Sequence, residues 1–216
     1  MHISSKPLIY LASASPRRSS LLTQIGIGHR VRPVDVDERP QAGEPPPDYV
    51  RRLALQKAQA LWGQLGAAER LPVLGSDTAV VVDSEILGKP SNEQDCLRML
   101  RLLSGRTHQV FTAVALCRAE GCVSKLSISD VTLRALTLDE MTAYWRSGEP
   151  ADKAGAYAVQ GFAAAFIERI AGSYSGIMGL PLYETTQLLA AIGWRLAGNS
   201  DADSRAMQGI TDEAHG

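Results

Sequence analysis

The chain has 216 residues, of which 45% are hydrophobic and 21% are charged, and its formal net charge is −1. This length suits one large domain or two small lobes around a real core. The nearly balanced charge excludes proteins that bind nucleic acid polymers or anionic membranes mainly through bulk electrostatics. No secretory leader and no apolar run long enough to span a bilayer is evident, so we expect a cytoplasmic protein.

The three cysteines are Cys96, Cys117 and Cys122. An odd number without a CxxC pair indicates reduced thiols, and it argues against a disulfide framework or a zinc site. The four histidines are scattered along the chain and form no HExxH motif. This usage agrees with the expected cytoplasmic location.

The first predicted elements are a short buried strand over residues 8–11 and a helix that begins at Pro16. Ser15 suits the N-cap position and proline suits the first helical position. Arg17 and Arg18 then occupy the first turn, where the positive end of the helix dipole makes each cation unfavourable by about 0.3–1 kcal/mol. A bound anion would reverse this penalty, since such a turn resembles a phosphate cradle. Two interpretations stay open, a phosphate site and a pair of solvated arginines.

A second strand is predicted over residues 29–36, and it ends in a group of carboxylates at Asp35, Asp37 and Glu38. Such a group is either solvated or able to hold a divalent cation. The next segment, residues 39–47, is rich in proline and glycine and is predicted to be a loop.

A helix capped by Asp48 is predicted to run to about Trp62. Lys57 falls on or beside its apolar face. A lysine in that position either extends its ammonium group toward water or meets an anion in a cleft. The apolar face consists of Val50, Leu53, Ala54, Ala58 and Leu61.

Two strand segments are predicted at 71–74 and 79–82, with residues 75–78 between them. Asp77 in this apolar stretch is costly unless it is paired, hydrogen-bonded or ligated. It is either a structural aspartate in a bulge or a catalytic carboxylate. Lys89 follows on a constrained loop between glycine and proline.

Gln160 lies in a later stretch of small residues, where glycines permit close backbone approach. Its amide offers two donor hydrogens and one acceptor, which suits a nucleobase edge as well as an ordinary loop hydrogen bond. From residue 198 the chain is polar and aperiodic, so residues 198–216 are predicted to be a disordered tail. The other predicted elements are helices over 91–103, 137–148 and 182–192, strands over 107–118, 122–136 and 163–170, and a mobile Gly- and Ser-rich loop over 172–179.

Seven short motifs occur in order along the chain. They are residues 11–18 (LASASPRR), 53–58 (LALQKA), 74–78 (LGSDT), 87–90 (LGKP), 103–108 (LSGRTH), 152–157 (DKAGAY) and 179–181 (GLP). Together they resemble the Maf family of nucleoside triphosphate pyrophosphatases over about residues 8–193. The first motif is the most specific of the seven.

The resemblance implies an α/β fold of the inosine-triphosphatase-like type, in which helices flank a mixed twisted sheet and two lobes enclose a central cleft. One such domain would span residues 1–197. The implied reaction is hydrolysis between the α- and β-phosphates of a nucleoside triphosphate, with a divalent cation, Mg²⁺ or Mn²⁺, as cofactor. The products would be the monophosphate and pyrophosphate.

The resemblance also implies a preference for dTTP and UTP, extending to modified pyrimidine nucleotides. The subgroup with this preference has Arg, Thr and Gln at three discriminating positions, matched here by Arg17, Thr78 and Gln160. A sister group that prefers 7-methyl-GTP differs at the last two. Ser76 and Val159 replace the more common alanine and isoleucine, and both changes are mild.

Specific roles follow for the matched residues. Asp77 is expected to accept the proton from the attacking water, and Glu38 is expected to bind the metal ion. The cationic members would hold the triphosphate and absorb charge on the leaving pyrophosphate. The residues expected to bind substrate are Ser13, Arg17, Arg18, Lys57, Thr78, Lys89 and Gln160.

Two other functions stay open at this point. The chain could be a nucleotide-binding regulator of cell division that does not turn over its ligand, or an enzyme that removes ITP, XTP or 7-methyl-GTP. No nucleic acid polymer and no membrane is expected as a partner, and the oligomeric state is left open, with a homodimer as one option.

Overall fold

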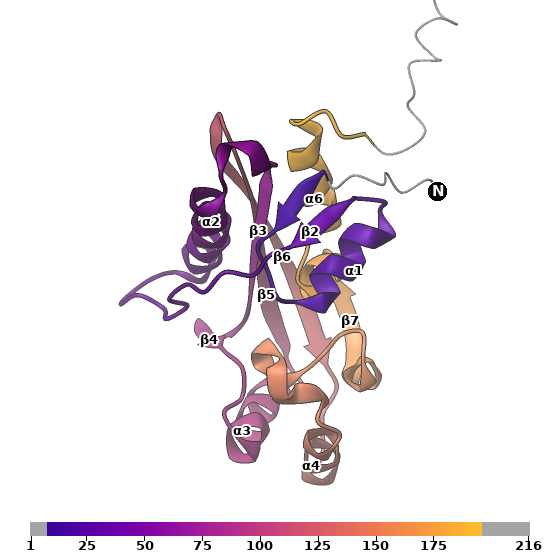
Figure 1. Cartoon of the computed structure of the whole chain (residues 1–216). Coiled ribbons are helices and arrows are strands. Elements are labelled where there is room, and N and C mark those ends of the chain that lie inside the picture. Colours follow the sequence, from indigo (N-terminus) through magenta and orange to yellow (C-terminus); the bar gives the residue numbers. More distant parts are fainter. Residues whose placement is uncertain (1–7, 196–216) are drawn as a thin grey trace, which may run out of the picture.

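The computed structural model describes residues 8–195, and a seven-stranded mixed sheet forms its centre (Figure 1). The strand order is β2-β1-β3-β5-β6-β7, and β4 pairs with β3 beside this path. β1 is parallel to β2 and β3, whereas the other pairs are antiparallel. The strands are β1 (Ile9–Leu11), β2 (His29–Val31), β3 (Val73–Val82), β4 (Glu85–Leu87), β5 (Thr107–Arg118), β6 (Gly121–Leu133) and β7 (Ile167–Ala171).

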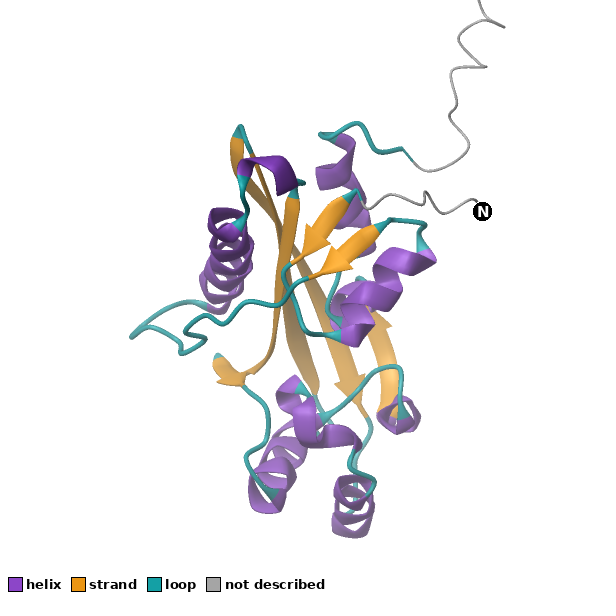
Figure 2. Ribbon diagram, in the orientation of Figure 1, coloured by secondary structure: helices purple, strands orange, loops and turns teal. Residues whose placement is uncertain are grey.

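Helices flank this sheet, as expected. Figure 2 shows α2 on one side of the sheet, with α1 and α6 on the other side and α3 and α4 at the far end. The helices are α1 (Pro16–Gln24), α2 (Pro46–Gln64), α3 (Glu93–Leu103), α4 (Leu138–Arg146), α5 (Tyr174–Met178) and α6 (Leu182–Ala190). Short 3₁₀ helices cover Ala67–Glu69, Glu149–Asp152, Ala154–Ala156 and Phe162–Phe166.

Side chains along the long strands alternate between the two faces of the sheet. One face carries one hydrophobic group, and the other face carries two, one at each end of the sheet. Ala113 on β5 faces α2. Leu74 and Val114 face the opposite way and pack with α1 and α6. Val80 and Val110, on that same face, pack with α3 and α4 at the other end of the sheet. The helices therefore form two lobes on one face, with a cleft between them as predicted.

The edge of β3 that faces β1 and β4 is only partly paired. β1 pairs with residues 73–74 of β3, and β4 pairs with residues 80–82. No described strand pairs with residues 75–79 on that side. The predicted site residues Asp77 and Thr78 therefore lie at an opening in the sheet.

Gly75 allows α2 to lie very close to this part of β3. A Cβ atom at this position would overlap the carbonyl oxygen of Ala54 and press on Ala58. Since Lys57 is the neighbour of Ala58, the close approach brings its side chain onto β3. Glycine is required here because any side chain would push the helix away.

Several predicted boundaries were wrong. The second strand ends at Val31 instead of residue 36, since its partner β1 is short and Pro33 has no N–H to donate. Helix α2 begins at Pro46, with Asp48 in its first turn instead of at the cap. Residues 75–78 do not separate two strands, because β3 runs through them in unbroken register with β5. Asp77 therefore does not lie in a bulge.

The segment from residue 163 to residue 179 also differs from its prediction, which was a strand over 163–170 and a mobile loop over 172–179. It forms a 3₁₀ helix, then β7, then the short helix α5. The Ser173 side chain caps α5 by accepting from the N–H of Gly176, and Thr112 on β5 donates to the Gly176 carbonyl at 2.8 Å. Gly179 ends α5 in the left-handed backbone conformation, and Gly172 lies close to Ser129 on β6. The predicted tail over 198–216 lies outside the described residues.

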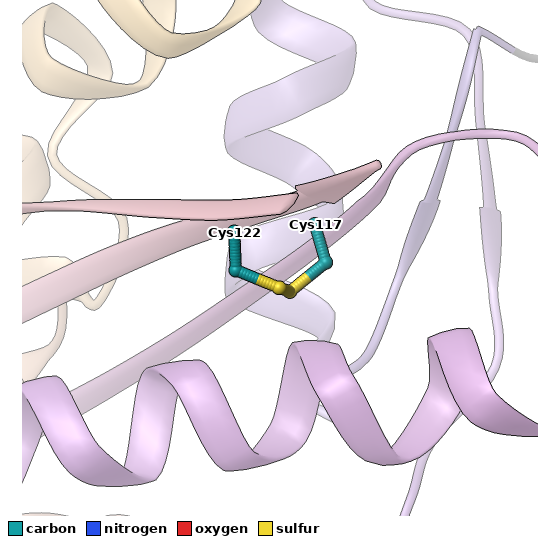
Figure 3. Close-up of a disulfide and its surroundings, with 2 residues drawn as sticks. All are labelled: Cys117 and Cys122. Atoms are coloured by element: carbon teal, nitrogen blue, oxygen red, sulfur yellow. A yellow bond between two sulfur atoms is a disulfide. The ribbon is translucent and has the colours of Figure 1, made fainter. Parts of the chain in front are cut away.

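The prediction of reduced thiols was wrong for two of the three cysteines. Cys117 and Cys122 face each other across the β5–β6 hairpin and form a disulfide on the side of the sheet near α2 (Figure 3). A hairpin can place two cysteines opposite each other at a spacing other than CxxC. Cys96 is a free, buried thiol, as predicted.

No helix within residues 8–195 combines the length and the apolar character needed to cross a membrane.

Candidate active site

A cavity of about 390 Å³ opens beside the unpaired edge of β3. Both lobes contribute to its wall, the first through the β1–α1 turn and the second through residues 152–160. The structure brings every predicted site residue to this cavity, although they are spread over most of the sequence. These residues are Ser13, Arg17, Arg18, Glu38, Lys57, Asp77, Thr78, Lys89 and Gln160.

Lys57 lies between two carboxylates at one end of the cavity. Its Nζ atom is 2.7 Å from Asp77 Oδ1 and 2.5 Å from Glu38 Oε1. The side chains of Lys57 and Asp77 are only 10% and 9% exposed, whereas that of Glu38 is 53% exposed. Of the two sequence-based interpretations of Lys57, the one that places it in a cleft is confirmed.

The two carboxylates have pKa values shifted in opposite directions. Burial raises the pKa of Asp77 above its ordinary value, against the opposing charges of Lys57 and Arg18. Partial burial has the same effect on Glu38, but the hydrogen bond and charge of Lys57 outweigh it and lower the pKa of Glu38. A carboxylate with a raised pKa suits proton transfer near neutral pH, and one that stays ionised suits the binding of cations.

Arg18 forms hydrogen bonds with three other residues of the cavity wall. Its guanidinium group donates to the Gly179 carbonyl at 2.8 Å, to Ser13 Oγ at 3.0 Å and to Thr78 Oγ1 at 3.4 Å. Ser76 Oγ donates to the same Gly179 carbonyl at 2.9 Å. Arg18 thus joins α1, β3 and the turn after α5, a structural role that its position in a first helical turn does not reveal.

Arg17 is more available to a ligand. Its side chain is 28% exposed, and its only close carboxylate among the described residues is Asp152, at 3.8 Å. Lys153 also lies on the cavity and forms an ion pair with Asp152. The motif at 152–157 was interpreted through its glycines, and its charged residues Asp152 and Lys153 were not predicted to belong to the site. The motif itself could have indicated them.

The cavity lining combines two kinds of side chain. Five basic side chains and three carboxylates line it together with the N-terminus of α1, so the charged part of the lining is net positive. The lining also contains apolar side chains and Gln160. Its apolar residues are Val80, Val110, Tyr157, Val159, Ile177 and Met178. A cavity of this kind can hold a polyanion against the basic side chains and a flat, partly polar ring against the apolar ones.

A family model described as Maf-like protein matches residues 8–192. The chain belongs to the Maf family.

Curated proteins related to this Maf chain cover most of its length. The dTTP/UTP pyrophosphatase of Colwellia psychrerythraea is 51% identical over 193 residues, which are 88% of this chain and 91% of that protein. The dTTP/UTP pyrophosphatase of Bordetella parapertussis is also 51% identical and covers 87% of this chain and 93% of that protein. Among solved structures, a Mycobacterium abscessus nucleoside-triphosphatase / dITP/XTP pyrophosphatase is 19% identical, with a TM-score of 0.41 over 58% of this chain and 73% of that chain.

The Maf cavity offers few protein ligands for a metal ion. Within residues 8–195, no group of three or more His, Cys, Asp or Glu side chains is arranged to hold one. Glu38 and Asp77 do converge on the same point, where Lys57 Nζ lies. Mg²⁺ is commonly bound by one or two carboxylates together with substrate phosphates. This pair therefore fits a metal ion that arrives with a polyphosphate.

Arg17→Ala is expected to lower kcat/KM about ten- to a hundredfold, because a charge-assisted contact to phosphate contributes about 1.5–3 kcal/mol. The melting temperature should hardly change, because Arg17 opposes the dipole of α1 in the empty protein. Steady-state kinetics and thermal melts measure the two effects, with Arg101→Ala on the exposed side of α3 as a control. A variant that melts well below the wild type yet hydrolyses normally would show that Arg17 is structural.

Proposed function

We propose that this Maf chain hydrolyses dTTP and UTP between the α- and β-phosphates and releases pyrophosphate. The observation that carries the proposal is the buried Asp77, held by Lys57 in a cavity that is lined by both basic and apolar side chains. The curated relatives with 51% sequence identity are named dTTP/UTP pyrophosphatases.

Substrate binding begins with charge. A nucleoside triphosphate carries about four negative charges, and the N–H groups at the start of α1 together with Arg17, Lys89 and Lys153 offer the matching positive field. Arg17 would exchange its weak contact with Asp152 for a phosphate oxygen. The base would then lie against the apolar side chains of the lining and Gln160.

The chemical step requires a water molecule to lose a proton as it attacks the phosphoanhydride. An oxygen–phosphorus bond forms, the bridging bond between the α- and β-phosphates breaks, and the proton passes to the Asp77 carboxylate. The raised pKa of Asp77 makes it a better base than an ordinary aspartate. Lys57 and the other cations absorb the charge that develops on the departing pyrophosphate.

A divalent cation, Mg²⁺ or Mn²⁺, is part of the proposal. Glu38 and Asp77 would hold it jointly with phosphate oxygens, and Lys57 would then move toward the phosphates. When bound, the cation neutralises phosphate charge and makes water more acidic.

A nucleotide panel tests the proposal. We expect dTTP and UTP to be cleaved well, CTP less well and purine triphosphates poorly, because a base that leaves Gln160 unpaired is strongly disfavoured. Pyrophosphate release is measured with Mg²⁺ and again with EDTA, which should abolish it. A higher kcat/KM for 7-methyl-GTP or ITP than for dTTP would contradict the substrate assignment. Tight binding without hydrolysis would instead favour a nucleotide-binding regulator.

A further inference from the structure

The loop that carries Gln160 is held by hydrogen bonds to two side chains that do not line the cavity. The N–H of Ala158 donates to the Tyr144 hydroxyl at 3.2 Å, and that hydroxyl donates to Glu149 Oε1 at 2.7 Å. Glu149 Oε2 accepts from the N–H of Phe162 at 2.8 Å. The two side chains thus hold the backbone on both sides of Gln160.

The loop lies very close to the Glu149 carboxylate at Gly161. A Cβ atom at Gly161 would overlap the Glu149 carboxylate. The ring of Phe162 also stacks on that of Tyr144, with centroids 6.0 Å apart and planes 22° apart. Backbone, carboxylate and ring contacts therefore all fix the same short segment.

The protonation states of the pair suit this role. Although burial opposes ionisation of Glu149, the hydrogen bonds from Phe162 and Tyr144 lower its pKa, so it remains an acceptor. Burial and the neighbouring carboxylate raise the pKa of Tyr144, so its hydroxyl remains a donor. Three backbone N–H groups, those of Ala158, Phe162 and Ala163, and the Tyr144 hydroxyl thereby find hydrogen-bond partners in this pair.

Neither side chain lines the cavity, whereas residues 157–160 do. We propose that Tyr144 and Glu149 are positioning residues for base selection, because they fix the segment 158–163 and so determine where the Gln160 amide meets the base. The inference rests on the proposed function, in which Gln160 contacts the base.

The test compares Glu149→Gln and Tyr144→Phe with the wild type. Each substitution keeps the shape of the side chain and removes part of the hydrogen bonding behind Gln160. We expect the ratio of kcat/KM for UTP to that for CTP to fall at least about tenfold in Glu149→Gln, because base discrimination depends on an accurately placed polar group. Inhibition by inorganic pyrophosphate should be unchanged, since the basic side chains of the cavity remain. Glu168→Gln, an exposed change of the same kind on β7, is the matched control.

Gln160→Ala separates this inference from the function on which it rests. If Gln160→Ala leaves the UTP to CTP ratio unchanged, the proposed contact of Gln160 with the base is wrong. If Gln160→Ala alters the ratio but neither Glu149→Gln nor Tyr144→Phe does, the positioning role is overturned.

The double variant supplies the decisive comparison. Adding Glu149→Gln to Gln160→Ala should change the ratio no further, because the loop then has no amide to place. A further change of similar size would show that Glu149 acts by another route. Should Glu149→Gln not fold, Tyr144→Phe keeps the aromatic packing and takes its place in the same cycle. If turnover is absent, the binding constants of non-hydrolysable UTP and CTP analogues provide the ratio.

Discussion

Asp77→Asn is expected to lower kcat at least about a hundredfold, because a positioned general base contributes roughly 10²–10⁴-fold. The asparagine keeps the shape of the side chain and removes its ability to accept the proton from water. Nucleotide affinity should be equal or tighter, since the cationic side chains remain and one negative charge near the phosphates is gone.

Single-turnover hydrolysis and calorimetric binding of a non-hydrolysable dTTP analogue measure these two effects separately. Asp130→Asn on the exposed surface of β6 controls for the chemical change itself. Near-normal hydrolysis by Asp77→Asn would refute the role of Asp77 as proton acceptor and would direct attention to Glu38.

Lys57→Met should lower kcat/KM by a similar factor and also move its pH dependence. The nearby ammonium group lowers the pKa of Asp77, so its removal raises that pKa further. Because the base must be ionised to act, the acid limb of the kcat/KM profile should shift to higher pH. Methionine is of similar length to the lysine side chain and carries no charge.

The same variant should also lose stability as the pH rises. Without Lys57, the folded-state pKa of the buried Asp77 lies further above its unfolded value than in the wild type, so the folded protein is favoured more strongly when the group is protonated. This contribution to stability should be present at low pH and be lost as the pH rises through the raised pKa, and the loss should be larger than in the wild type. Thermal melts across the pH range follow this trend. An acid limb that stays in place or moves to lower pH would contradict the coupling of Lys57 to Asp77.

The helices and the long strands of this fold could be predicted from local patterns. Thr137 and Glu140 form the capping box that their spacing indicates, and Asn92 caps α3 by accepting from the N–H of Asp95. Short elements were harder to predict, because long-range contacts determine them. β2 stops where its partner ends, and α5 is held by Thr112, which lies more than 60 residues earlier in the chain.

The membership of the cavity could also be predicted, mostly through the motifs that carry the family resemblance, although Glu38 and Gln160 lie outside them. Arg17, Lys57 and Asp77 each allowed an ordinary structural explanation, and only the fold brings them to one cavity. The supporting contacts were not predicted because the partners are distant in sequence. Arg18 meets Gly179, and Glu149 meets the backbone of Phe162, through contacts that no local pattern encodes.

The unpaired edge of β3 has a consequence for how this fold can change. The reactive centre exists because β1 and β4 both stop short of residues 75–79, so strand length, as much as side-chain identity, keeps it open. An insertion that lengthened either strand across residues 75–79 would extend the hydrogen-bond ladder along this edge and close the opening beside Asp77 without substituting any residue of the cavity. Among relatives of this chain, insertions and deletions beside these two strand ends are therefore a route to an inactive or repurposed protein that a comparison of site residues alone would overlook.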